Sequence, residues 1–178
     1  MRTLTALRER FQSEKGNLAV TAALEHYTAT LAETLLDDPA ARAEIGHDGV
    51  RYLLMWHALE EAEHKAVAFD VYQRVGGTER MRVAIMWMIH LTFVLETSIW
   101  TVISLAKDPD ARRHPGRVLR GVWRLRRSPF TSPRAMRQLF EYHRPGFHPN
   151  DRDTAELIAA WRAKLFGSGG DLTELLAG

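Results

Sequence analysis

The stretch from Trp56 to Lys65 carries the residue types best suited to chemistry in this sequence. It reads Trp-His-Ala-Leu-Glu-Glu-Ala-Glu-His-Lys. Because each residue of a helix turns by about 100°, four of the polar side chains of this stretch fall within an arc of about 100°. They are His57, Glu60, Glu61 and His64. Apolar residues precede and follow them on the same side. A helix face that begins and ends apolar is expected to point at a core, although its middle carries two carboxylates and two imidazoles.

A carboxylate on such a face needs a counter-charge, and a divalent metal supplies one. Glu61-x-x-His64 is the i, i+3 pair found in carboxylate-bridged dimetal helix bundles. His57 and Glu60 would bind the metal directly or support its ligands. The alternative is a solvated helix face in which Glu61 and Lys65 form an ordinary i, i+4 ion pair. Both interpretations stay open at this point.

A further carboxylate lies on the helix expected over residues 18–36, which Asp37-Asp38-Pro39 ends. Glu25 shares a face of this helix with small or apolar residues: Leu18, Ala22, Ala29, Ala32 and Leu36. Small side chains let a second helix approach closely, and the helix that carries Glu61 is the obvious partner. Glu25 is therefore a candidate metal ligand. The alternative is an ion pair with His26 or an arginine.

Length and composition predict one soluble domain over residues 1–178, and the helices expected along the chain make it all-helical. The chain is 46% hydrophobic and 26% charged, with a net charge of +2. It contains no cysteine, so disulfides, thiolate nucleophiles and thiolate metal sites are excluded. The N-terminus lacks the uninterrupted apolar core of a signal peptide, so a cytoplasmic protein is expected.

The remaining helices follow from capping and breaking residues. The helix of Glu61 is expected over residues 48–75, ended by Gly76-Gly77. A third helix is expected over about 78–107, with Thr78 as N-cap, and it is nearly all apolar from Val83 to Ala106. Its length would cross a bilayer. Because His90 and Glu96 interrupt it, a buried or oligomer-interface helix is preferred to membrane association, and a true span comes last.

A basic helical segment is expected over residues 110–140. Its nine arginines are interleaved with Trp123 and Phe130. No nucleic-acid motif accompanies them, so a solvated helix near a membrane or a partner is preferred to a nucleic-acid surface. A peripheral membrane contact is therefore one expected interaction.

A turn and a last helix are expected over residues 141–166. The turn contains His143 and His148 among prolines, Gly146 and Asn150. His148 is a sixth candidate metal ligand, brought in from a loop. The preferred alternative is a turn residue hydrogen-bonded to backbone.

Three segments, at residues 23–29, 56–70 and 144–149, together resemble a bacterial family known as the predicted metal-dependent hydrolases. The resemblance implies a ferritin-like helical bundle. A ferritin-like dimetal site takes one Glu from each of two helices and one Glu-x-x-His from each of two others. This chain offers half of that set, Glu25 with Glu61 and His64. Family members are longer and begin with a segment that carries another such half, so the chain resembles their C-terminal portion. A homodimer would restore the full set by two-fold symmetry.

These observations favour a metal-dependent enzyme with a Glu/His site in half of a dimetal four-helix bundle. Iron is the first expectation for the metal, with manganese or zinc as alternatives. The reaction would be hydrolysis or di-iron oxidoreductase chemistry, on a small hydrophobic substrate. The competing hypotheses are a non-catalytic protein that binds metal, membrane or a partner, and a truncated remnant without the other half of the site.

Overall fold

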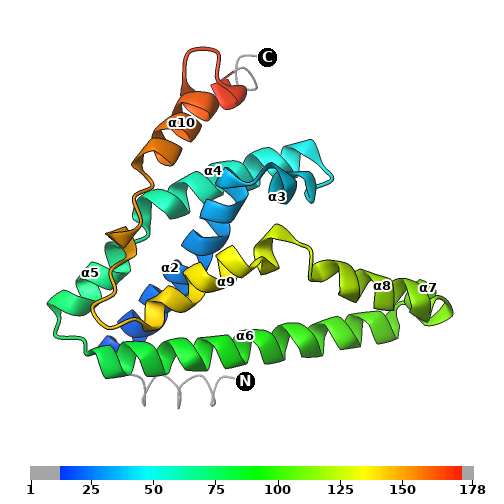
Figure 1. Ribbon diagram of the computed structural model, residues 1–178, viewed down its shortest axis with the longest axis horizontal. Coiled ribbons are helices and arrows are strands. Elements are labelled where there is room, and N and C mark those ends of the chain that lie inside the picture. Colours follow the sequence, from blue (N-terminus) through cyan, green and yellow to red (C-terminus); the bar gives the residue numbers. More distant parts are fainter. Residues whose placement is uncertain (1–12, 174–178) are drawn as a thin grey trace.

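The computed structural model describes residues 13–173, and all the regular structure within that range is helical, as predicted. Helix α2 (Glu14–Asp37) lies at the centre and contacts α4 (Asp48–His64), α5 (Val67–Arg74), α6 (Glu79–Lys107) and α9 (Pro133–Phe140) (Figure 1). Short helix α3 (Pro39–Ala43) joins α2 to α4. The core is thus built around one helix rather than between two layers.

Small side chains allow α2 to take this central place. Ala19, Ala22, Ala23, Ala29 and Ala32 are all buried, so neighbouring backbones pack close to it. The helix begins where the Ser13 hydroxyl accepts the Gly16 N–H at 3.0 Å. It ends at Asp38, whose side chain caps α3 through the Ala40 N–H at 2.8 Å. The predicted helix over 18–36 is confirmed, with four more residues at its start.

The single helix predicted over residues 48–75 is wrong, because it is broken into α4 and α5 at Lys65 and Ala66. The Lys65 side chain is 6% exposed and reaches away from α4 toward α2 and the C-terminal segment. After α5, Gly76 adopts a φ of +78°, and a Cβ at Gly77 would lie 2.3 Å from the Tyr72 ring. The predicted Gly76-Gly77 stop therefore has a steric basis.

Helix α6 begins at the predicted N-cap, where the Thr78 hydroxyl accepts the Met81 N–H at 3.3 Å. Its buried residues are confined to its first half: Arg82, Met86, Ile89 and His90. The second half runs beyond the body as an arm (Figure 1). Burial within the chain, one of the two preferred alternatives for α6, thus holds for its first half only, and the oligomer interface stays a prediction. Within the described part of the chain, α6 is also the one helix that is long and apolar enough to cross a membrane, by length and composition alone.

The basic segment 110–140 is a series of short helices rather than one. It comprises α7 (Pro109–Arg113), α8 (Pro115–Leu125), a 3-10 turn η1 (Pro129–Thr131) and α9. A proline stands at the start of each, where its missing N–H leaves no bond unmade. Helix α8 turns back over the arm of α6, and α9 returns to the body (Figure 1).

The C-terminal segment consists of two 3-10 turns and helix α10 (Ala155–Phe166), and α10 packs against α4 and α2. The turns are η2 (Glu141–His143) and η3 (Pro149–Asp151). Trp161 donates its indole N–H to the Leu36 carbonyl at 2.8 Å, which fastens α10 to the end of α2. The predicted turn and helix over 141–166 are present.

Candidate metal centre

Five of the six candidate ligands line one cleft of about 390 Å³ between α2, α4 and the start of α5. They are Glu25, His57, Glu60, Glu61 and His64, and Val67 completes the lining. The pairing of α2 with α4 brings Glu25 to the Glu-x-x-His pair, as the small residues of α2 predict. That these residues bind metal stays a prediction.

Glu25 is held in place by a backbone donor. Its Oε2 accepts the Ala68 N–H at 3.1 Å, in the first turn of α5. Partial burial raises the pKa of Glu25; the Ala68 hydrogen bond acts against this, the nearby Glu61 charge raises it further, and His64 lowers it. Glu25 thus lies near enough to Glu61 and His64 for their charges to act on its pKa.

Both carboxylate oxygens of Glu61 contact polar side chains, one on α2 and one on α4. The Thr28 hydroxyl donates to Oε2 at 2.6 Å, and His57 Nε2 lies 3.3 Å from Oε1. Sequence reasoning missed Thr28, although it stands three residues after Glu25 and therefore on the same side of α2. The ion pair described as the alternative for Glu61 and Lys65 does not form, because the Lys65 amine pairs with Glu33 instead.

The chemistry of these donors fits a divalent metal, since carboxylates and imidazoles are ligands of iron, manganese and zinc. In this structure the donor side chains do not surround a single metal position. Across residues 13–173, no three His, Asp or Glu side chains are gathered closely enough to hold a metal ion. His57, Glu60 and His64 are exposed. Each carboxylate oxygen of Glu61 has a further lone pair, so Glu61 could bind a metal and keep the Thr28 hydrogen bond.

His148 does not line the cleft. Its Nε2 lies 2.8 Å from Asp70 Oδ1, and its Nδ1 accepts the Asn150 N–H at 3.1 Å. The ring also packs edge-on against Phe69, with centroids 5.2 Å apart. This arrangement resembles the alternative of a turn residue bonded to backbone. In this structure His148 joins η3 to α5.

A buried ionic network joins α2 to the end of α4, and sequence reasoning missed it. Glu33 and Lys65 are each 6% exposed and lie 3.3 Å apart. Lys65 also donates to the Arg152 carbonyl and the Thr154 hydroxyl, both at 2.9 Å, while the Arg152 guanidinium binds Glu33 at 3.0 Å. The network joins α2, the end of α4 and the segment before α10. It therefore fixes His64, the neighbour of Lys65, relative to α2.

An apolar groove of about 320 Å³ adjoins the cleft and shares His57 and Glu61 with it. Its other walls are mainly hydrophobic: Leu31, Ala32, Leu35, Ile45, Leu54, Ala58 and Phe130, with Thr28. The groove and the polar cleft are thus two parts of one continuous surface along α2 and α4.

A family model described as predicted metal-dependent hydrolase matches residues 1–153. The chain belongs to this family. Membership implies a divalent metal and hydrolytic chemistry at the level of the family's description. The matched range includes every candidate ligand. No match was found among curated proteins or among solved structures.

Proposed function

We propose that this protein is a metal-dependent hydrolase whose divalent metal is held by Glu25, Glu61 and His64. The observation that carries the proposal is that α2 and α4 bring these three side chains to one cleft in a chain of this family. His57 and Glu60 line the same cleft and complete the set of donors. His148, which has other partners, is kept outside the site.

The chain's own residues prepare the site in specific ways. The Ala68 N–H orients Glu25, and the Thr28 hydroxyl orients Glu61. His57, which is exposed and lies 3.3 Å from Glu61, can take up or release a proton at Nε2. A bound metal would supply an activated water or polarise a carbonyl or phosphoryl oxygen.

A second half of the site would make it a ferritin-like dimetal centre. Such a centre takes a Glu and a Glu-x-x-His from each half, and α2 and α4 supply one set. A second copy of the chain, related by a two-fold axis, would bring an identical set. Iron is the metal we expect for such a site, with manganese or zinc as alternatives. A completed iron site would also suit di-iron oxidoreductase chemistry, which is the second candidate function.

The apolar groove favours a small substrate with a hydrophobic part. Because the groove shares His57 and Glu61 with the cleft, an apolar chain lying in it would place an attached polar group beside the candidate ligands. The walls come from α2, α4 and η1, with Ile45 from the segment before α4. The groove therefore supports the expected hydrophobic substrate.

The test is metal content per chain by elemental analysis, with the oligomeric mass measured on the same sample. We expect bound iron, manganese or zinc in the wild type and its loss in Glu61→Ala. Glu63→Ala is the matched control, because Glu63 lies on the same helix but binds Arg162 at 2.8 Å. Hydrolysis of nitrophenyl esters with acyl chains of increasing length then tests the reaction and the groove. Equal metal content in wild type and Glu61→Ala would overturn the proposed site.

A further inference from the structure

The arm built by the second half of α6, α7 and α8 presents apolar side chains to solvent. Only 11% of the apolar 18-residue window of α6 is buried inside the protein, counted as a share of that window. Leu91, Leu95, Ile99 and Val102 are each at least half exposed. At 100° per residue these four fall within an arc of about 80°, so they form a straight stripe along the helix. An exposed stripe of this length on a monomer marks an interaction surface.

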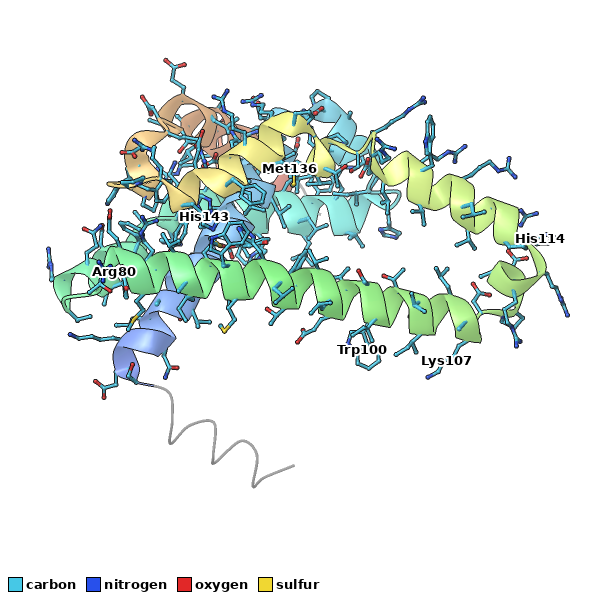
Figure 2. All side chains as sticks on the ribbon, turned by 60° about the horizontal axis from the view of Figure 1, so that its bottom comes forward. Arg80, Trp100, Lys107, His114, Met136 and His143 are labelled. Carbon is cyan, nitrogen blue, oxygen red and sulfur yellow. The ribbon has the colours of Figure 1, made fainter. Side chains whose placement is uncertain are left out.

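The stripe faces away from the side of α6 that packs on the body. Helical periodicity places the buried residues Met86 and Ile89 roughly opposite it. Further along that opposite side, the helix carries Glu96, Thr97, Thr101 and Ser104 around Trp100. Figure 2 shows α6 running on past the body, with Trp100 and Lys107 toward its far end. The arm is thus apolar along the stripe, whereas its other side mixes hydroxyl groups with Phe93 and Trp100, which are both more than half exposed.

Helix α8 also has an apolar side and a polar side, and its polar side is positively charged. Val118, Leu119, Val122 and Leu125 share one side, whereas Arg117, Arg120 and Arg124 share the other. Leu119 is 71% exposed, and none of the residues of α8 is buried. Trp123 stands at the border between the sides, with the Arg127 guanidinium 4.4 Å from its ring centroid. This is the pattern of a helix that lies in a membrane interface.

The charge of the arm identifies the surface it would meet. Residues 107–127 contain eight Lys or Arg and two Asp, a net charge of +6. Pairing this arm with the same arm of a second copy would bring like charges together. An anionic lipid surface instead satisfies the arginines at its headgroups and the apolar side chains just below them. A span is disfavoured, since the first half of α6 packs on the protein and Glu96 lies further along.

We propose that α6, α7 and α8 form a membrane-binding arm that lies in the surface of an anionic bilayer. The apolar sides of α6 and α8 enter the headgroup region, and the arginines of α7 and α8 bind the lipid phosphates. His114, at the bend between α7 and α8, marks the tip of the arm (Figure 2). The inference does not depend on the metal site.

The test is flotation of the full chain with vesicles of phosphatidylcholine alone or with phosphatidylglycerol. We expect at least ten-fold stronger binding to the anionic vesicles, weakened by salt. Arg120→Glu with Arg124→Glu should reduce that binding at least ten-fold. Arg134→Glu with Arg137→Glu in α9 is the matched control, with the same change in charge on exposed side chains outside the arm.

A second pair of variants tests the apolar stripe. Leu95→Ser with Ile99→Ser changes only exposed side chains, so helix content by circular dichroism should be unchanged. We expect this pair to lose most of its vesicle binding and to keep the oligomeric mass of the wild type. Absence of binding to anionic vesicles at low salt would overturn the proposal. A fall in oligomeric mass in Leu95→Ser with Ile99→Ser, with vesicle binding unchanged, would overturn it too and identify the stripe as an interface between copies.

Discussion

The carboxylate of Glu25 on α2 accepts the backbone N–H of Ala68 on α5 at 3.1 Å. The N-cap residue of α5, Ala66, has no side chain that can do this, so α5 is capped from another helix. The same carboxyl lines the candidate metal cleft. Glu25 therefore links the packing of α5 to the geometry of the site.

Substitution of Glu25 should separate its two roles. Glu25→Ala removes both the cap and a ligand, so the free energy of unfolding should fall by about 1 kcal/mol, the usual value of a cap. Glu25→Gln keeps an acceptor oxygen and should lose less than half of that. Both should lose bound metal. Urea unfolding of metal-free protein and elemental analysis measure the two effects. Unchanged stability in Glu25→Ala would show that the Ala68 bond contributes nothing.

The network of Glu33, Lys65 and Arg152 should be the most sensitive polar feature of the body. Removing one member leaves an uncompensated buried charge, so Glu33→Ala should cost about 3–5 kcal/mol of unfolding free energy. Glu63→Ala breaks the partly exposed pair with Arg162 and should cost about 1 kcal/mol or less. Thermal and urea unfolding of both variants provide the comparison. Similar losses in the two would mean that burial adds nothing to the Glu33 pair.

Helix spacing predicts that Glu25, Glu61 and His64 line one cleft. Glu25 lies among small buried residues of α2, as expected. The expectation that the Glu61 side of α4 points at the core is wrong, because α4 packs through its opposite side and Leu53 and Leu54 beside Glu61 are exposed. The break at Lys65 was not predictable in this way. At the break, the Lys65 side chain donates to Glu33, 32 residues earlier in the chain, and to the Arg152 carbonyl, 87 residues later. Periodicity reports the side on which a residue lies, but not its distant partner.

The cover of α6 is not predictable from its sequence for a related reason. Apolar residues from Val83 to Ala106 predict a helix that is buried or lies at an oligomer interface. The structure covers Met86 and Ile89 but leaves Leu91, Leu95 and Val102 exposed. Hydrophobicity alone does not tell whether protein, lipid or a second copy covers a face. The positive charge of α7 and α8, which follow α6 in the chain, is the observation that favours lipid.

The His148 side chain should stabilise the packing of η3 against α5. His148→Ala removes the contact with Asp70 and the bond from Asn150, so the free energy of unfolding should fall by about 1–2 kcal/mol. Metal content should remain that of the wild type. Asp70→Asn, which retains an acceptor for the ring, serves as the milder comparison. Loss of metal from a folded His148→Ala protein would instead bring His148 into the site.

Acid should destabilise the fold through His26, whose Nε2–H donates to the Gln138 and Leu139 carbonyls at 3.2 and 3.1 Å. Burial lowers its pKa to about 3, from 6.5 in an exposed histidine. The unfolded chain therefore binds the extra proton first, and stability falls as the pH drops from 6.5 toward 3. Between pH 6.5 and 4.5 the loss from this one group is about 2–3 kcal/mol. Burial also lowers the pKa of His90 and of His143, so both add to the effect.

Urea unfolding across this range should give a flatter pH dependence for His26→Gln than for the wild type. His47→Gln, at an exposed position, should follow the wild type. A slope for His26→Gln equal to that of the wild type would assign the acid sensitivity to other groups.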